Sequence, residues 1–331
     1  MKKKSNYKSK YVLQWHITHI CNLRCRHCYQ EDYYNHMPKE DFYMALDKFC
    51  DYIEDKNVVP QINLTGGEPL THPNFFDFAK EIVNRNIKLG ILTNGILIDE
   101  DMARRISELK PVAVQVSIDG CKETHEYIRG KGTFDRTLQA IDYLNKYNVT
   151  VIVSFTAQKF NYKDYEKLVA ICKEHNVHKI WWDRIVTYSD EDTKDNALST
   201  EEFKELVEVT NRLKQEYKPY GFVANERGLQ FIGSNDCGYI CGAGGNLIIF
   251  LADGNVMPCR RIPFIIGNIK EDSLENIIKN SELMQELKRF YAPIECRMCN
   301  HFMKCRGGSK CVTYAQIGNL YQKDVNCFLE I

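Results

Sequence analysis

The sequence predicts an α/β fold in which six parallel strands form an open, partial (β/α)6 barrel, followed by a small cysteine-rich domain. Between Tyr11 and Tyr188, short β-rich runs alternate with longer helical patterns, the order expected for βα units. Seven glycines then crowd the span from Gly221 to Gly245, and eight of the 14 cysteines occur from Cys237 onward. We therefore expect a barrel at 1–190, a bridging helix and loop at 191–236, and a cysteine-rich domain at 237–331.

The predicted strands are rich in Val, Ile, Leu and aromatic residues and lie at Val12–Thr18, Gln61–Thr65, Lys88–Thr93, Val112–Ile118, Thr150–Thr156 and Lys179–Val186. Helices are predicted at Asp41–Lys56, Asn74–Asn86, Asp99–Leu109, Thr133–Tyr147, Tyr162–His175 and Thr200–Tyr217, several beginning at Asp, Asn or Thr caps. Six βα units are two short of a closed eight-fold barrel, so the barrel stays open. Loops after its strands form the active face.

Composition narrows the classes of partner. Lysine plus arginine and aspartate plus glutamate both number 44, so no global charge attracts nucleic acid or an anionic membrane. No stretch reaches the roughly 20 apolar residues of a membrane span, and no signal peptide begins the chain, so we expect a cytoplasmic protein. Cysteines of a cytosolic chain are kept reduced, which makes metal binding the default explanation for so many of them.

Three cysteines fall within eight residues of the loop after the first predicted strand: Cys21, Cys25 and Cys28. Three thiolates ligate only three of the four irons of a cubane, whereas iron-sulfur clusters normally take four cysteines, so one iron is left open. The alternative is a tetrahedral zinc site, for which the local fourth ligands are His16, His19 and His27.

The order of this triplet, with three and then two residues between the cysteines, resembles the signature of the radical S-adenosylmethionine (SAM) superfamily. His27 stands at the position where the family has an aromatic residue. The resemblance implies a 4Fe-4S cluster whose open iron chelates SAM, and cleavage of SAM to methionine and a 5′-deoxyadenosyl radical.

Further motifs at strand ends resemble SAM-binding segments of this family. Gly66, Gly67 and Glu68 end the second strand, where the family binds the methionine amino group, and two glycines permit close backbone approach. Asn94 and Ser117 end the third and fourth strands and resemble positions near the ribose and carboxylate, with turn chemistry as the alternative. Two arginines, Arg129 and Arg184, are candidates for pairing a carboxylate, with structural salt bridges as the alternative.

The C-terminal cysteines form two possible sets of four, which zinc ribbons also explain. The segment from Cys241 through Cys259 to Cys327 resembles the SPASM extension of radical SAM peptide maturases, which implies two auxiliary 4Fe-4S clusters. Carried over by position, the first takes Cys237, Cys241, Cys259 and Cys311, and the second takes Cys296, Cys299, Cys305 and Cys327.

One spacing departs from the family. Five residues separate Cys305 from Cys311, where the family usually has three, so Cys311 is the weakest ligand assignment. The remaining cysteines, Cys50, Cys121 and Cys172, match no motif and are expected to be buried thiols in or beside helices.

The resemblance implies an enzyme that cross-links or oxidises a ribosomally made peptide or protein, using a low-potential electron donor. Sulfatase maturation is disfavoured, because Arg260 stands where those maturases have an aspartate base. Leader recognition is expected from a separate protein, from the barrel or from the bridge. No general acid or base is assigned; candidates are Asp183, Tyr188, Asp236 and Tyr239.

Two alternatives stay open from the sequence. The first keeps the radical chemistry but acts on a small molecule such as a tetrapyrrole. The second is a zinc-holding interaction protein without catalysis. Neither the substrate, the bond formed nor the oligomeric state follows from the sequence.

Overall fold

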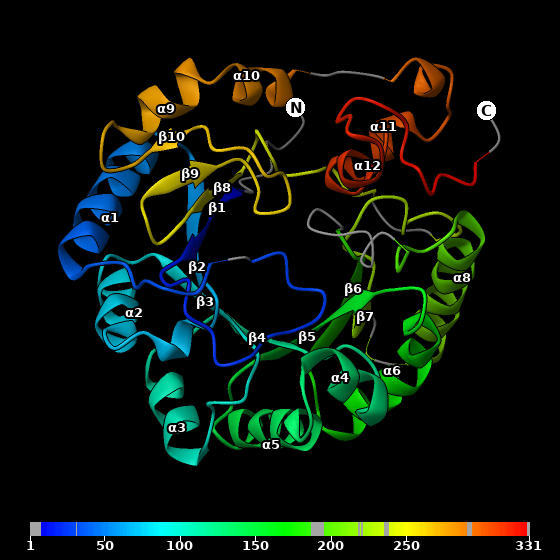
Figure 1. Cartoon of the computed structure of the whole chain (residues 1–331), viewed down its shortest axis with the longest axis horizontal. Helices are drawn as coiled ribbons and strands as arrows, with labels where there is room; N and C mark the ends of the chain where they lie inside the picture. The colour runs from blue at the N-terminus through cyan, green and yellow to red at the C-terminus, as the bar shows by residue number, and fades with distance from the viewer. Residues whose placement is uncertain are drawn as a thin grey trace, which may run out of the picture.

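One curved sheet of ten strands organises the molecule (Figure 1). The computed structural model describes residues 8–30, 32–186, 195–217, 219, 221–234, 238–289 and 293–329. The strand order is β10-β9-β8-β1-β2-β3-β4-β5-β6-β7, so the sheet has two free ends and does not close. Its centre is formed by six parallel strands: β1 Ser9–His16, β2 Val58–Thr65, β3 Lys88–Thr93, β4 Ala113–Ser117, β5 Val151–Ala157 and β6 Lys179–Arg184. The partial barrel is confirmed.

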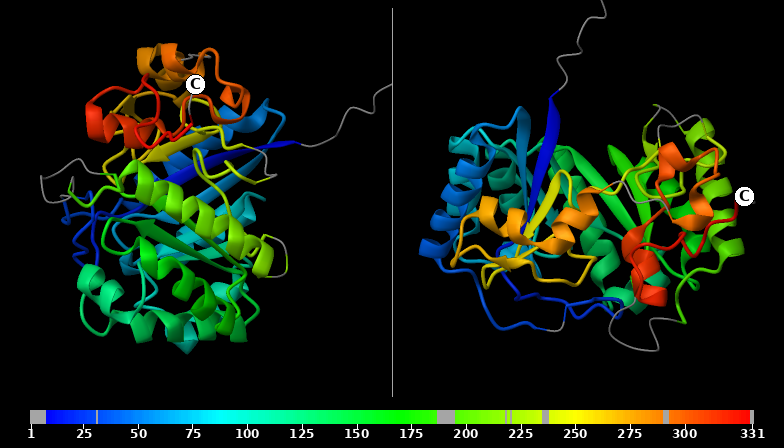
Figure 2. Two further views of the ribbon diagram at one scale, coloured as in Figure 1. Left: turned by 90° about the vertical axis from the view of Figure 1, so that its right-hand side faces the viewer. Right: turned by 90° about the horizontal axis from the view of Figure 1, so that it is seen from above.

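Helices cover the outer side of this sheet, as both Figure 1 and Figure 2 show. They are α1 Lys39–Glu54, α2 Phe75–Asn84, α3 Glu100–Glu108, α4 Lys122–Arg129, α5 Thr133–Lys146, α6 Tyr165–Glu174 and α8 Thr200–Glu216. Within the described part of the chain, every helix is too short or too polar to span a lipid bilayer.

The two faces of the sheet differ in polarity. On β1 the buried Tyr11, Leu13 and Trp15 point outward, and the ring of Trp15 stacks on Phe42 of α1 at 4.4 Å. Side chains alternate between the two faces of a strand, so His16, which follows Trp15, faces the inside of the barrel. The hydrophobic core therefore lies between sheet and helices, and the barrel interior is left for polar groups.

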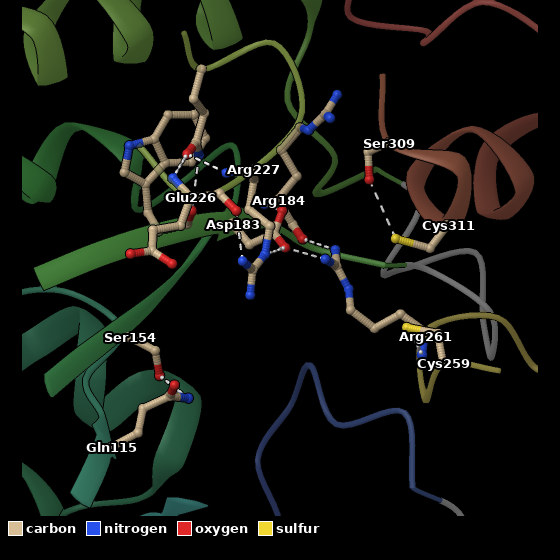
Figure 3. A network of polar contacts seen from close by, with 12 residues as sticks. Gln115, Ser154, Asp183, Arg184, Glu226, Arg227, Cys259, Arg261, Ser309 and Cys311 are labelled. Carbon is tan, nitrogen blue, oxygen red and sulfur yellow. Dashed lines mark hydrogen bonds and ion pairs between the residues drawn. The ribbon is translucent and has the colours of Figure 1, made fainter. Parts of the chain in front are cut away.

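Polar pairs continue along the inner face. His16 is in register with Thr65 of β2, and Gln115 of β4 donates a 3.2 Å hydrogen bond to the Ser154 hydroxyl of β5 (Figure 3). Asp183 of β6 lies on the same face. A polar inner face is suited to binding a polar ligand. It would be a poor surface for packing a hydrophobic core.

Short strands extend the sheet at both ends. At one end β7 Val223–Ala224 pairs with β6. At the other end β8 Leu247–Phe250 pairs with β1, β9 Asn255–Met257 pairs with β8, and β10 Gly267–Asn268 pairs with β9. β8 runs parallel to β1, with Phe250 opposite Trp15. The sheet thus crosses the predicted boundary at residue 237 without a break in the order of strands.

The C-terminal part of the chain, after β10, lies at the open side of the barrel (Figure 1). It contains α9 Leu274–Asn280, α10 Glu282–Lys288, α11 Phe302–Cys305 and α12 Lys310–Ile317. Figure 1 shows α9 near α1 and β10, and α11 and α12 on the side of β6 and α8.

The predicted barrel elements agree with the structure to within a few residues at each end. Among the described helices of the barrel, α4 is the one that the prediction omits. This helix has eight residues and buries only His125 and Ile128, so its apolar pattern is too weak to be recognised in sequence. The Asp99 side chain caps α3 by accepting from the Met102 backbone, whereas no side-chain cap bond forms at Asn74.

A buried ion pair joins the barrel to the end of the chain. The Arg184 guanidinium, at the end of β6, donates from its two terminal nitrogens to the two oxygens of Asp324, at 2.6 and 2.9 Å. Their side chains are 3% and 1% exposed. Asp324 also accepts from the Ser309 backbone, so one carboxylate holds two C-terminal segments against β6.

We predict that Asp324→Asn lowers the free energy of unfolding by about 3–5 kcal/mol, because it leaves the buried Arg184 charge without a counter-ion. The denaturant concentration at half-unfolding measures this change. Asp101→Asn, which removes a carboxylate from an exposed pair with Arg104 on α3, serves as the control and leaves the midpoint unchanged. Equal midpoints for the two variants would contradict the role of the buried pair.

Candidate active site

The first cysteine triplet lies in the loop that leaves β1 at the inner edge of the barrel. Cys21 and Cys25 are half-buried and Cys28 is exposed. The Cys28 backbone donates to the Cys25 carbonyl at 3.0 Å, which folds the loop into a tight turn. The return segment is anchored nearby, where the Met37 backbone donates to the Ile17 carbonyl at 2.9 Å. The three thiols are therefore held on one compact loop.

The glycine pair after β2 clamps the entry to this loop. The Gly67 backbone donates to the Thr18 carbonyl at 2.8 Å, and the Glu68 backbone donates to the Ile20 carbonyl at 2.9 Å. A Cβ at Gly66 would lie 2.3 Å from the Thr18 oxygen, and one at Gly67 would lie 2.4 Å from the Ile20 oxygen. The glycines therefore allow the backbone after β2 to pack closely against the backbone of Thr18–Ile20, which leads into Cys21.

Glu68 connects the ends of β2 and β3. Its fully buried carboxylate accepts from the Thr93 hydroxyl at 2.7 Å, the Asn94 backbone at 2.8 Å and the Leu70 backbone at 3.2 Å. Burial raises the pKa of Glu68 to about 7, against these hydrogen bonds, which favour the ionised form. Three of about four acceptor positions are occupied, so the main contact of this side chain is with β3.

Donors surround the sulfurs of the triplet. The Leu23 backbone lies 3.4 Å from Cys21 Sγ, and the Asn94 side-chain nitrogen lies 3.9 Å from the same sulfur. Asn94 also donates to the Asn22 side chain at 2.8 Å, a partner that the sequence did not single out. N–H groups aimed at sulfur stabilise metal-bound thiolates. The donor set therefore fits a cysteine-ligated cluster.

Asp119, which follows β4, is the buried centre of a second link to the loop. Its carboxylate accepts from Arg129 at 2.6 Å and lies 3.0 Å from His27 Nε2, while the Thr156 backbone donates to it at 2.9 Å. Burial opposes its ionisation, but Arg129 and His27 outweigh that effect and hold the pKa of Asp119 well below its usual range. This residue was not assigned from sequence, where an Asp before a glycine indicates a turn.

The remaining residues predicted near SAM take different positions. Arg129 pairs with Asp119, the salt-bridge alternative, and its Nη1 lies 3.9 Å from Cys25 Sγ. Ser117 ends β4 in register with Ser154 of β5, half-buried on the inner face. Arg184 is likewise in a structural pair. Asn94 and Ser117 thus lie at neighbouring strand ends, and both arginines already hold protein carboxylates.

Three of the four cysteines predicted for the first auxiliary set come together. Cys241, Cys259 and Cys311 belong to one buried cluster, and Cys237 lies outside the described residues. Burial, and next the nearby thiols of Cys311 and Cys241, raise the pKa of Cys259 to about 12. The Arg261 backbone approaches Cys259 Sγ at 3.4 Å, and the Ser309 hydroxyl is 3.3 Å from Cys311 Sγ.

The unusual spacing before Cys311 is absorbed by a turn. Arg306, Gly307 and Gly308 all have positive φ, between 50° and 87°. A Cβ at Gly308 would lie 2.3 Å from the Asp324 carboxylate, so this position requires glycine. The turn redirects the chain from α11 into α12, which places Cys311 beside Cys259 despite the two additional residues.

The second auxiliary set lines a single cavity. All four predicted cysteines contribute to its wall, together with Leu229, Phe302 and Asp324. Burial first, and then the other three thiols, raise the pKa of Cys296 to about 11. Among the described residues, no three His, Cys, Asp or Glu side chains converge tightly enough to ligate one metal ion.

A network of charges connects β6 with the first auxiliary set (Figure 3). Asp183 accepts from Arg227 at 2.7 Å and forms an ion pair with Arg261, two residues after Cys259. Burial opposes ionisation of Asp183, yet Arg261 and Arg227 lower its pKa. Such a carboxylate is a poor proton acceptor, which disfavours it as a general base.

The other acid–base candidates give no second choice. Burial raises the pKa of Tyr239. Tyr188 and Asp236 lie outside the described residues.

Three cysteines match no motif. Cys172 is buried, while Cys50 and Cys121 are half-buried. The prediction that all three are buried thiols therefore holds for Cys172 and is wrong for Cys50 and Cys121, which are partly exposed.

Two family models match the chain. The model of the Radical SAM superfamily matches residues 15–172, and that of the SPASM iron-sulfur cluster-binding domain matches residues 241–300. These spans contain the first cysteine triplet and four of the C-terminal cysteines, Cys241, Cys259, Cys296 and Cys299.

The relatives of this chain differ in what their names describe. The chain is 26% identical to the AdoMet-dependent heme synthase of Methanosarcina barkeri, over 96% of this chain and 95% of that protein. It is 27% identical to the subtilosin biosynthesis protein AlbA of Bacillus subtilis, over 94% of this chain and 67% of that protein. Streptococcus suis SuiB bound to its precursor peptide SuiA has the same fold, with a TM-score of 0.75 at 19% identity, covering 97% of this chain and 76% of SuiB.

We predict that Gly67→Ala reduces the iron bound at the first triplet, because its Cβ cannot fit against the Ile20 carbonyl and the cysteine loop must move. Iron and labile sulfide in the anaerobically reconstituted protein measure the loss. Gly245→Ala is the matched control, since its nearest neighbour would be 3.5 Å away. Full iron content in Gly67→Ala would show that the glycine contact does not position the triplet.

Proposed function

Because this chain belongs to the radical SAM superfamily and carries a SPASM iron-sulfur domain, we propose that it uses a 5′-deoxyadenosyl radical to cross-link or oxidise a ribosomally made peptide. The observation that carries the proposal is the arrangement at the strand ends. The cysteine loop after β1 is clamped by the Gly66–Glu68 backbone after β2 and contacts Asn94 after β3. A loop fixed in this way presents three sulfurs at the inner edge of the barrel.

We assign Cys21, Cys25 and Cys28 to the SAM-binding 4Fe-4S cluster. When bound there, the cluster supplies the electron that splits SAM. The residues of the chain would hold the reactants: the backbone of Gly66 and Gly67, with Glu68 behind it, would bind the amino group of SAM. Asn94 and Ser117 would bind its ribose and carboxylate. Arg129 and Asp119 fix the outer half of the loop.

We assign two further 4Fe-4S clusters to the C-terminal cysteines, which makes three in all. The grouping of Cys241, Cys259 and Cys311, and the cavity lined by the other four cysteines, support this assignment. With four protein ligands each, these clusters suit removal of the second electron from the substrate. A low-potential donor supplies the first electron, and a separate protein provides leader binding where the barrel does not.

A peptide substrate is supported by the relative named for bacteriocin biosynthesis and by the neighbour with a bound precursor peptide. The heme synthase relative favours a second candidate, a radical enzyme that acts on a tetrapyrrole, since it aligns over nearly the whole chain. Short peptides encoded beside the gene, and coproporphyrin III, a tetrapyrrole that appears in the name of a second Methanosarcina barkeri relative, are the substrates to compare. A mass change in the peptide supports the proposal, and turnover of coproporphyrin III alone overturns it in favour of the second candidate.

We predict that Cys28→Ala abolishes formation of 5′-deoxyadenosine but keeps about eight of about twelve irons, because only the first cluster loses a ligand. Chromatography of the nucleoside and iron analysis measure both quantities. Cys50→Ala on α1 is the control and keeps both at the wild-type level. Wild-type nucleoside formation by Cys28→Ala would refute the assignment, and zinc without labile sulfide in the wild-type protein would refute the enzyme altogether.

We also predict that Cys327→Ala retains SAM cleavage but forms no modified product, because the second electron then has no acceptor. Comparing 5′-deoxyadenosine with product in the same reaction separates the two steps. An unchanged ratio of product to nucleoside would remove the auxiliary clusters from the mechanism.

A further inference from the structure

Arg260 differs from the other arginines around the barrel mouth. Arg129, Arg184, Arg227 and Arg261 are each paired with a buried aspartate. Among the described residues, Arg260 forms no ion pair, and its buried Nε has no hydrogen-bond partner. Buried N–H groups are nearly always paired, more so on charged side chains, so an unpaired one in a site indicates a missing ligand.

The position of Arg260 places it between the two cysteine loops. It directly follows Cys259 of the first auxiliary set, and its guanidinium lies 4.7 Å from the centre of the Tyr29 ring. Tyr29 directly follows Cys28 of the first triplet. The guanidinium thus lies between the cysteines assigned to the SAM cluster and those assigned to the auxiliary cluster, where a substrate must bind to give up a hydrogen and then an electron.

Two histidines near Arg260 also have unpaired atoms. His16, at the inner end of β1, is 4% exposed and its Nε2 has no hydrogen-bond partner in the described structure. The same holds for Nδ1 of His19. Burial, and after it the positive charge of Arg260, lower the pKa of His16. The positive charge of Arg260 therefore reaches this imidazole, whose ring also forms a hydrogen bond with the Gly66 backbone.

Two acidic side chains, Asp253 and Asp32, act by their charge on the neighbouring His19. However, the Asp253 carboxylate accepts from the backbone of Asn255 at 3.0 Å and from its side chain at 2.7 Å. Among the described residues neither carboxylate forms an ion pair with Arg260, so its positive charge is left available on the inner side.

We propose that Arg260, with His16 and His19, forms an anion subsite that binds a carboxylate of the substrate. A planar guanidinium binds a carboxylate through two parallel hydrogen bonds, and a partly buried one does so with little competition from water. The carboxylate belongs to an Asp, a Glu or a C-terminus in a peptide, or to a propionate in a tetrapyrrole. This proposal rests on the proposed function, since it takes the barrel mouth as the substrate site.

Two matched pairs of probes test the proposal on the reconstituted protein with SAM bound. One pair is a random decapeptide pool and the same pool after methyl esterification, and the other is coproporphyrin III and its tetramethyl ester. We expect the wild-type protein to bind the acid form with an affinity at least about ten-fold higher than the ester in one of the two pairs, measured as the amount of each form retained by the protein. Arg260→Gln loses this preference, Arg260→Lys recovers part of it, and the surface control Arg104→Gln keeps it.

The outcomes separate this proposal from the function on which it rests. Preference for the acid form of the peptides supports both. Preference in the coproporphyrin pair alone keeps the anion subsite and overturns the peptide substrate. Equal retention of acid and ester by the wild type, or full preference in Arg260→Gln, overturns the subsite. Should Arg260→Gln lose iron, His16→Phe, which leaves the Cys259 loop unchanged, replaces it, and full acid preference in that variant overturns the subsite.

Discussion

The backbone contact between Thr18–Ile20 and Gly66–Glu68 is the constraint on which the site depends. Two hydrogen bonds join the segments, and neither glycine has room for a Cβ. Because Glu68 then bonds to Thr93 and Asn94, the ends of three parallel strands are fixed to one another before any cysteine is considered. The cysteine loop inherits its position from this contact, so three sulfurs can be held in place although the loop itself packs little apolar surface.

Buried carboxylates extend the same principle around the barrel. Asp119 after β4 holds His27 and Arg129, and Asp183 at the end of β6 holds Arg227 and Arg261. An ionised carboxylate away from water is costly unless charged donors surround it, so each of these groups requires its partners in a defined geometry. The pairs therefore give little net stability and much positional precision. Separating the partners would leave a buried charge without a counter-ion, which is costly. The pairs therefore hold segments that are distant in the sequence at fixed positions relative to one another.

The fold was predictable because the alternation of apolar strands and helices is strong from Tyr11 to Arg184, and the triplet was predictable because three cysteines share one loop. Long-range pairings were not. Nothing in the sequence around Asp119 indicates that its partners are His27 and Arg129, since those contacts depend on how strand ends are brought together in space. The same applies to β8, which joins β1 across more than 200 residues and carries the cysteine-rich part onto the sheet. A four-residue strand has no periodicity that could specify such a partner.

The division between a helix-facing core and a polar inner face has a consequence for substrate choice. Outward residues such as Trp15 are committed to packing on α1, where a change in volume costs stability. Inward residues such as Gln115 and Ser154 contact each other and leave the core untouched when they change. One scaffold can then keep its cluster loops and alter the groups that meet the substrate, which is consistent with relatives named for heme synthesis and for bacteriocin biosynthesis. Substrate specificity in this chain is therefore to be sought on the inner face and at its rim, where the Arg260 guanidinium, which forms no ion pair among the described residues, favours an anionic substrate.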